Sequence, residues 1–318
     1  MKKDPLIRPP SSGTFSPGEK VGSGATRMRG FVGNSSKQMT IEEKFRQLQR
    51  AVSRAKHKHL KQPAKLPRSH RLVEECIKGR VARNEWGGFF MTQEALPFGR
   101  PYGKLRIGDI AVADLSPLNV FLKGSSLPSN PSRLVYLDIE TAHLPDGPGA
   151  CAFLVGLGSA EGAQFLLRQF FLRRYKEEKA MLAALAEAIA GQEALVTYNG
   201  KAFDVPVLEA RYSAVGLPSP FDRLIHLDLL HPVRRLWKRQ LANCRLKSLE
   251  EQILGIERNG DVPGAEIPGI YFDYLRTGDA CGLQPVFFHN ALDIVSLAAA
   301  GTEMGRVLGD PEELLTVL

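Results

Sequence analysis

The stretch Leu134–Asp138 is apolar at every position except its last, so its side chains do not alternate between apolar and polar. A strand with this pattern is buried on both faces, as in a sheet covered by helices above and below. The chain must therefore place a layer on each side of this strand. With 318 residues, 43% of them hydrophobic, it can bury a core of that kind.

The segments that follow this strand predict a mixed α/β domain. Further strands are expected at Ala152–Leu157, Phe165–Leu172 and Ala194–Tyr198. Helices are expected at Glu177–Ile189, at Val205–Val215 and from about residue 290 to 308. Three strands followed by a helix, a strand and more helices indicate a mixed sheet covered on both sides.

The charge of the chain is concentrated at its N-terminal end. Residues 1–80 hold 19 Lys and Arg against 6 Asp and Glu, whereas the remaining residues hold 23 and 28. A basic arm joined to a mildly acidic body suits contact with a polyanion. The alternative is a tail that only adds solubility.

Composition and periodicity divide the chain into five parts. We expect a disordered basic tail over residues 1–40, a basic helical segment over 41–80, and a small β-rich extension with a linker over 81–130. The α/β domain is expected over residues 131–308, followed by a C-terminal tail over 309–318.

Several classes of protein are excluded by this sequence. It contains no apolar run near the ~20 residues of a membrane span, and no apolar stretch of the secretory type follows its N-terminal charges. The four cysteines are widely spaced and form no CxxC pair: Cys76, Cys151, Cys244 and Cys281. We therefore expect reduced thiols, no structural zinc, no membrane contact and a cytoplasmic location.

Two carboxylates mark the end of the first buried strand. Asp138 and Glu140 are two residues apart, so they project to the same face of the strand. Carboxylates held together repel each other unless a cation compensates, and oxygen ligands favour Mg²⁺ or Mn²⁺. The alternative is a strand end with acidic side chains that are simply solvated.

Two later segments carry similar polar groups. In the segment from Thr197 to Asp204, Asn199 can serve only a turn and Asp204 only a helix cap, or both can contribute to a site beyond the strand end. His289 and Asp293 are four residues apart on the last helix and share one face. They are either parts of one site or a surface pair.

Together, the strand DxE, the NxxxxD segment and the HxxxD of the last helix resemble the three exonuclease motifs of the DEDD superfamily, which has the ribonuclease-H-like fold. The sequence between the motifs, which includes Asp-Val-Pro-Gly at residues 261–264, is similar to the YprB-type ribonuclease-H-like domain of bacteria. The resemblance covers roughly residues 85–305. It implies a mixed five-stranded sheet with helices on both faces.

The resemblance also implies a site and a chemistry. The four metal ligands of the superfamily fall on Asp138, Glu140, Asp204 and Asp293. They would hold two Mg²⁺ or Mn²⁺ ions ~3.5–4 Å apart for phosphodiester hydrolysis, with His289 accepting a proton from the attacking water.

The histidine position departs from the best-known branches of that superfamily. One branch places His five residues before the last Asp, where this chain has Phe288, and the other places Tyr four residues before it, where this chain has His289. A shift of one residue rotates a helical side chain by ~100°. The sequence therefore leaves open whether His289 is the general base.

Basic residues near the motifs form a predicted nucleic-acid interface. Arg234, Arg235, Lys238 and Arg239 form a stripe along one helix, which we expect to follow a phosphate backbone. Asn199, within the second motif, is also a candidate for this interface. Lys201 and Arg211 flank the motif, and each either contacts phosphate or pairs with local acids such as Glu209. Asp228 either supports the site or caps a helix.

The sequence thus predicts a metal-dependent 3′→5′ exonuclease that acts on single-stranded ends of DNA or RNA. The polarity comes from the resemblance alone. The alternative from another class is a catalytically silent module of the same fold, which binds nucleic acid or recruits a protein partner.

Overall fold

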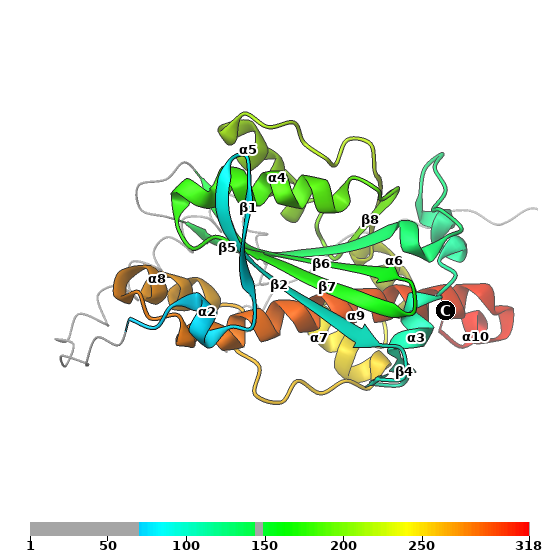
Figure 1. Cartoon of the computed structure of the whole chain (residues 1–318). Helices are drawn as coiled ribbons and strands as arrows, with labels where there is room; N and C mark the ends of the chain where they lie inside the picture. The colour runs from blue at the N-terminus through cyan, green and yellow to red at the C-terminus, as the bar shows by residue number, and fades with distance from the viewer. Residues whose placement is uncertain (1–69, 144–148, 318) are drawn as a thin grey trace, which may run out of the picture. The chain divides into compact units, whose positions relative to one another are not determined.

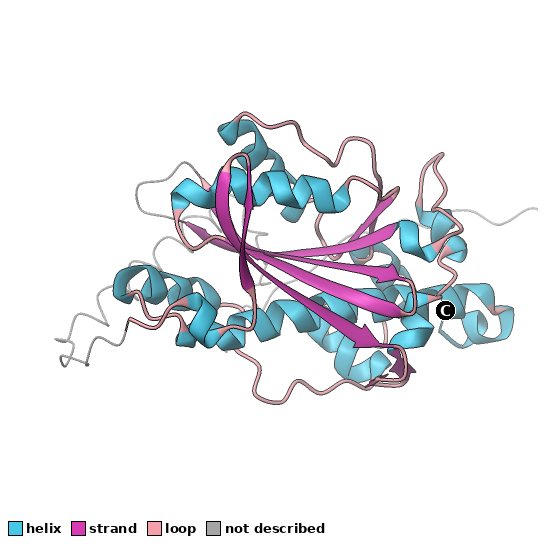
Figure 2. Ribbon diagram, viewed as in Figure 1, coloured by secondary structure: helices cyan, strands magenta, loops and turns pink. Residues whose placement is uncertain are grey.

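The computed structural model describes residues 70–143 and 149–317. In these residues a seven-stranded sheet has the strand order β1-β2-β7-β6-β5-β8-β9 (Figures 1 and 2). The expected disordered tail, and residues 41–69 of the expected helical segment, lie outside the described residues. The strands are β1 (Arg80–Asn84), β2 (Gly87–Pro97), β5 (Leu134–His143), β6 (Ala150–Glu161), β7 (Gln164–Phe171), β8 (Ala194–Thr197) and β9 (Ile225–Asp228).

Strand β5 lies where the two halves of the sheet meet. It pairs in parallel with β8, which pairs in parallel with β9, and it pairs antiparallel with β6 on its other side. Leu134, Val135 and Leu137 are all buried, so the prediction of a strand covered on both faces is confirmed. The pairing with β6 shifts register between Glu140 and Thr141, and this bulge lies beside the predicted acidic pair.

The sheet has two strands more than the five predicted. Strand β2 pairs antiparallel with β7, and β1 pairs with β2, so residues 80–97 extend the main sheet. Phe90 of β2 is fully buried and its ring meets those of Phe171 and Phe287. The reason is physical: without β2, strand β7 would expose a row of unpaired backbone groups.

Helices cover both faces of the sheet, as predicted. Helices α4 (Glu178–Ile189) and α5 (Asp204–Val215) lie on one face, and α9 (Gln284–Gly309) runs across the other (Figure 1). Leu185 and Leu208 belong to one buried cluster, whereas Leu297 and Ala298 belong to a second. Helix α9 is continuous and brings the third acidic motif beside Asp138 and Glu140 of β5.

The other elements are short. They are α2 (Val73–Cys76), β3 (Pro101–Tyr102), β4 (Leu105–Arg106), α3 (Ile107–Ala111), η1 (Ser116–Phe121), η2 (Pro131–Arg133), η3 (Tyr175–Glu177), α6 (Leu230–Trp237), α7 (Leu246–Leu249), η4 (Glu250–Leu254), α8 (Ile267–Thr277), η5 (Cys281–Leu283) and α10 (Pro311–Val317). Most of the segment expected to be a tail is therefore helix α10. Within residues 70–143 and 149–317, no helix combines the length and the apolar character that a bilayer span needs.

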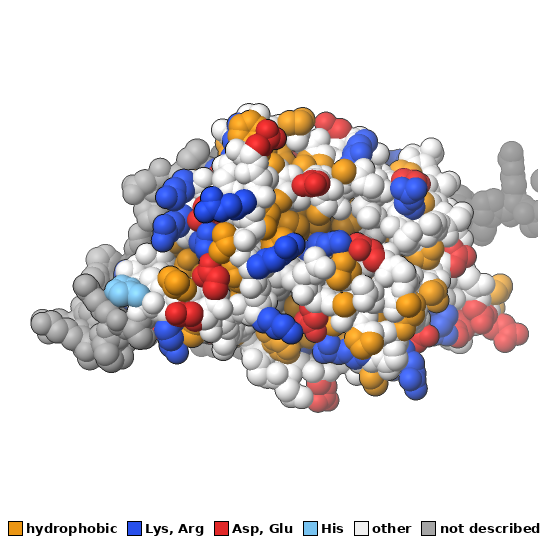
Figure 3. Space-filling model, viewed as in Figure 1, with side chains coloured by type: hydrophobic (Ala, Val, Ile, Leu, Met, Phe, Trp, Pro, Cys, Tyr) orange, Lys and Arg blue, Asp and Glu red, His pale blue; other side chains and the backbone are white. Residues whose placement is uncertain are grey.

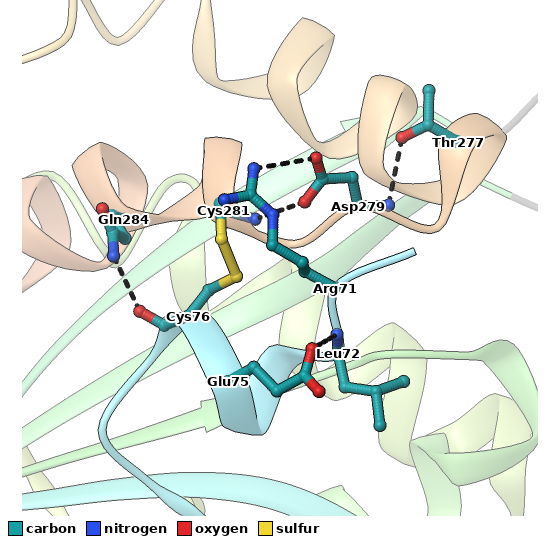
Figure 4. The surroundings of a disulfide bond; sticks show 8 residues. All are labelled: Arg71, Leu72, Glu75, Cys76, Thr277, Asp279, Cys281 and Gln284. Carbon is teal, nitrogen blue, oxygen red and sulfur yellow. Dashed lines mark hydrogen bonds and ion pairs between the residues drawn. A yellow bond between two sulfur atoms is a disulfide. The ribbon is translucent and has the colours of Figure 1, made fainter. Parts of the chain in front are cut away.

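A disulfide joins Cys76 at the end of α2 to Cys281 at the start of η5 (Figure 4). The two Cα atoms are 4.9 Å apart, although 205 residues separate them in sequence. The prediction of reduced thiols is wrong for this pair, while Cys151 and Cys244 are free. An ion pair of 3.1 Å between Arg71 and Asp279 lies beside the bond. The cysteines meet only because the chain returns here before α9.

Replacing Cys281 with Ser should lower the free energy of unfolding by about 2–4 kcal/mol, because a cross-link over a long loop restricts the unfolded chain. Urea unfolding without reductant measures this, and Cys244→Ser, at a half-buried free cysteine, is the control. With strong reductant, the parent and Cys281→Ser should unfold at the same midpoint. A difference that persists in reductant would contradict the disulfide as its cause.

Candidate metal centre

The four predicted carboxylates come from three elements that meet beside the second half of β5. The expected strand end at Asp138 is wrong, because β5 continues past Glu140 to His143 in its pairing with β6. Asp138 and Glu140 lie in β5, Asp204 begins α5, and Asp293 lies in α9. Ligand atoms of Glu140, His289 and Asp293 are all within 4.8 Å of one another. Asp138 adjoins this group, since the charges of Asp293, Asp204 and Glu140 all act on it. Residues far apart in the sequence thus form one acidic cluster.

Burial is the largest cause of the raised pKa values in this cluster. It raises the pKa of Asp138 well above its usual range, that of Glu140 to about 8 and that of Asp204 to about 7. The charge of Asp293 raises all three further. Asp293 itself differs: burial raises its pKa, but the hydrogen bond from His289 and the charge of Arg258 bring that pKa below its usual value.

This donor set fits a divalent cation. All four carboxylates offer hard oxygen ligands, which Mg²⁺ and Mn²⁺ prefer. The pKa values of Asp138, Glu140 and Asp204 stay raised, chiefly by burial, so the ionised forms of these side chains need a further positive charge for balance. A bound cation would supply that balance.

A chain of hydrogen bonds absent from the sequence analysis holds Asp138 in place. Asn290 Nδ2 donates to Asp138 Oδ2 at 3.0 Å, and its Oδ1 accepts from Gln169 Nε2 at 3.0 Å. Gln169 Oε1 in turn accepts from Thr92 Oγ1 at 3.0 Å. Asn290 is fully buried, and Gly156 leaves room for it, since a Cβ there would lie 2.4 Å from Asn290 Oδ1. One indication of this chain is present in the sequence: Asn290 is a polar residue on the last helix, between His289 and Asp293.

His289 lies between two carboxylates. Its Nδ1 is 2.9 Å from Asp261 Oδ1, and its Nε2 is 3.3 Å from Asp293 Oδ2. Burial alone would lower the pKa of His289, but the hydrogen bond and the charge of Asp293 raise it to about 9. Arg258 contacts Glu250, Asp261 and Asp293. Arg258 and Asp261 were not predicted, because they lie in a loop without periodicity.

The turn between β8 and α5 carries two predicted interface residues. Asn199 has a φ of 65°, and the backbone N–H groups of Asn199 and Lys201 donate to Asp228 at 2.8 and 3.1 Å. Asp228 also accepts from the backbone N–H of Leu230 at 3.0 Å, where α6 begins. Asp228 therefore braces the turn and binds the first backbone N–H of α6, whose N-cap residue is Leu229. The side chains of Asn199 and Lys201 are exposed.

Arg211 does not lie at the surface. Its side chain is 6% exposed, and its Nε and Nη2 donate to the two oxygens of Glu178 at 2.7 and 2.6 Å. The guanidinium thus joins α5 to α4, so the predicted contact of Arg211 with nucleic acid is wrong. Its partner is Glu178 rather than the nearby Glu209, because the packing of two helices selects it.

The predicted basic stripe is exposed. Arg234 and Arg235 lie in α6, and Lys238 and Arg239 follow its end. All four line one surface hollow of about 370 Å³, together with Leu236 and Val317. They therefore present positive charge on a common surface.

A second hollow lies between α4 and the strands β1, β2 and β7. Figure 3 shows this side of the molecule, where apolar side chains are visible between Lys and Arg. Arg80, Arg83 and Arg168 line the hollow, but so does Glu161, which binds Arg168 through two hydrogen bonds of 2.8 and 3.0 Å. This mixed lining does not single out a polyanion.

Comparison with known families supports the fold. The model of the RNase_H superfamily matches residues 135–303, which is more than half of the chain and includes all four carboxylates. The chain belongs to the RNase_H superfamily. The predicted ribonuclease-H-like resemblance is therefore confirmed. Members of this superfamily that are nucleases usually use divalent metals, in agreement with the acidic cluster.

The chain is similar to a curated protein and, more distantly, to a solved structure. The uncharacterized protein YprB of Bacillus subtilis (strain 168) is 33% identical over 178 residues, which are 56% of this chain and 43% of YprB. The chain thus spans less than half the length of that relative. The family B DNA polymerase of Pyrobaculum calidifontis is 15% identical with a TM-score of 0.38, over 70% of this chain and 32% of the polymerase.

In EDTA the chain should lose thermal stability as the pH rises from about 5 to about 9. In the folded chain the pKa values of Glu140 and Asp204 are about 8 and about 7, whereas the ordinary pKa values of 4.5 and 3.8 apply to the unfolded chain. His289, at about 9 against 6.5, acts in the same direction. The folded state therefore binds more protons than the unfolded state across this window, so its stability falls with pH.

Thermal unfolding at several pH values measures this effect. Glu140→Gln should reduce the fall, because it removes one of the titrating groups, whereas Glu312→Gln at an exposed position should not. A parent protein whose stability stays constant over this range would contradict the predicted coupling.

Proposed function

We propose that the chain is a metal-dependent nuclease that hydrolyses phosphodiester bonds by a two-metal mechanism, as a 3′→5′ exonuclease on single-stranded ends. The observation that carries this proposal is the acidic cluster of Asp138, Glu140, Asp204 and Asp293 beside the half-buried His289. Membership of the RNase_H superfamily supports it. The polarity and the preference for single strands follow from the motif resemblance.

The residues have distinct roles in this proposal. Asp138, Glu140, Asp204 and Asp293 would hold the cations, which supply an activated water and stabilise the charge on the attacking and leaving oxygens. His289 in its neutral form takes the proton of the water at Nε2. The water oxygen bonds to phosphorus as the bond from phosphorus to the 3′ oxygen breaks, and that oxygen receives a proton from solvent.

One observation favours the alternative of a silent nucleic-acid-binding module. Arg258 donates to Asp293, so a guanidinium already neutralises one of the four carboxylates. The same contact is compatible with catalysis, because Arg258 engages one oxygen of Asp293, the other faces His289 Nε2 at 3.3 Å, and the pKa values of Asp138, Glu140 and Asp204 remain raised. An assay of phosphodiester hydrolysis distinguishes the nuclease from the silent binding module.

With Mg²⁺ or Mn²⁺, the parent should shorten single-stranded DNA or RNA labelled at its 5′ end into a ladder, and should release a 3′ label at once as a mononucleotide. Asp138→Asn and Asp293→Asn should each reduce the rate by about a thousandfold, because a metal ligand supplies several kcal/mol of transition-state stabilisation. Asp273→Asn, at a side chain that is 71% exposed, should have no effect. Binding without cleavage under every metal condition would support the silent module.

Replacing Arg234 and Lys238 together with Ala should flatten the salt dependence of binding to a single-stranded oligonucleotide. Each lost phosphate contact should lower the slope of log affinity against log salt by roughly 0.7. Fluorescence anisotropy in EDTA measures this without cleavage, and Arg276→Ala, at an exposed arginine of α8, is the control. An unchanged slope would remove the α6 stripe from the interface.

A further inference from the structure

The loop between η4 and α8 packs against His289. It contains Asp261-Val-Pro-Gly264, a segment to which the proposed reaction assigns no role. A Cβ on Gly264 would lie 3.9 Å from His289 Nε2, so the backbone of the loop approaches the imidazole closely. The loop is therefore part of the wall of the acidic cluster.

Asp261 faces the inner nitrogen of the histidine. Its Oδ1 and Oδ2 lie 2.9 and 3.0 Å from His289 Nδ1, and its side chain is 8% exposed. Both ring nitrogens face carboxylates, which accept hydrogen bonds when ionised, but Nδ1 has two Asp261 oxygens at 2.9 and 3.0 Å whereas Nε2 has one Asp293 oxygen at 3.3 Å. A neutral ring therefore keeps its one proton on Nδ1. The unprotonated nitrogen is then Nε2, which lies 3.3 Å from Asp293 Oδ2. The tautomer that exposes an acceptor to the site is thus selected by Asp261.

Arg258 holds Asp261 in this position. Its Nη1 donates to Asp261 Oδ2 at 3.1 Å, its Nε donates to Glu250 Oε2 at 2.6 Å, and its Nη2 donates to Asp293. The Arg258 side chain is 3% exposed and Glu250 is fully buried. This guanidinium therefore joins Asp261 and Asp293, which lie on either side of the histidine ring.

This arrangement accounts for the unusual spacing of His289. A histidine four residues before the last aspartate leaves the helix in a direction rotated by ~100° from one placed five residues before it. Helical geometry alone therefore does not decide where its ring nitrogens point. A hydrogen-bond partner outside the helix has to set the orientation of the ring, and Asp261 lies within hydrogen-bond distance of Nδ1.

We propose that Asp261 is a positioning residue: it fixes the tautomer and ring direction of His289, so that Nε2 can accept a proton in the hydrolysis, and Arg258 holds Asp261 for this purpose. The catalytic part of this inference rests on the proposed nuclease function. The tautomer of His289 can be measured whether or not the chain is a nuclease. The logic is that of a carboxylate behind a catalytic or metal-binding histidine, which sets the direction and tautomer of the ring.

The first test is spectroscopic and needs neither metal nor substrate. The full chain is labelled with ¹⁵N-histidine, the His289 signals are assigned with His289→Gln, and the spectra are recorded at a pH where the ring is neutral. The parent should show a proton on Nδ1, and Asp261→Asn should move at least part of the population to the Nε2-protonated form that free imidazole side chains favour. A parent ring protonated on Nε2, or a tautomer unchanged in Asp261→Asn, would overturn the proposal.

The second test separates positioning from a merely structural role. Asp261→Asn should reduce the single-turnover rate of hydrolysis by about 10- to 100-fold, while Mn²⁺ affinity and oligonucleotide affinity stay within about twofold. Asp261→Glu, which retains the carboxylate, should recover part of the rate. An Asp261→Asn rate equal to that of the parent would overturn the proposal. If the parent hydrolyses nothing, the nuclease function fails, and the tautomer spectra alone decide whether Asp261 positions His289.

Discussion

The withdrawal of neighbouring carboxylates from water, together with their mutual repulsion, is the constraint on which the site depends. Asp138, Glu140 and Asp204 are withdrawn from water beside Asp293, and their pKa values rise as a result. Side chains in this state destabilise a folded protein at neutral pH unless they are neutralised. This destabilisation is located beside β5, which pairs with β6 on one side and β8 on the other, so the strand cannot move without losing backbone hydrogen bonds. A bound divalent cation would neutralise these carboxylates and remove the destabilisation.

Hydrogen bonds and an ion pair from neighbouring side chains fix the positions of the carboxylates. Asn290 fixes Asp138 from one side through a chain that reaches β7 and β2, and Arg258 fixes Asp293 from the other through a buried ion pair. The two added strands therefore do more than extend the sheet, since Thr92 of β2 ends one of these chains. Fixed ligands are what a metal site needs, because ligand geometry is set by the residues behind the ligands.

Sequence patterns predicted the parts of this structure that depend on local periodicity. The apolar run of β5, the alternation that places Asp138 and Glu140 on one face, and the helical spacing of His289 and Asp293 are all local properties. The Cys76–Cys281 bond and the partner of Arg211 could not be predicted in this way, because packing between distant segments determines them. Asp261 was missed for a related reason: a loop residue shows no periodicity, and its role depends on where the loop returns.

Diffraction from crystals soaked in Mn²⁺, with anomalous maps at the metal edge, tests the account most directly. We expect two anomalous peaks roughly 3.5–4 Å apart, each within coordination distance of carboxylates from the set of Asp138, Glu140, Asp204 and Asp293. In Asp138→Asn crystals at least one peak should weaken. Well-ordered parent crystals that show no peak at this cluster under saturating Mn²⁺, with the Arg258–Asp293 pair intact, would contradict the metal centre.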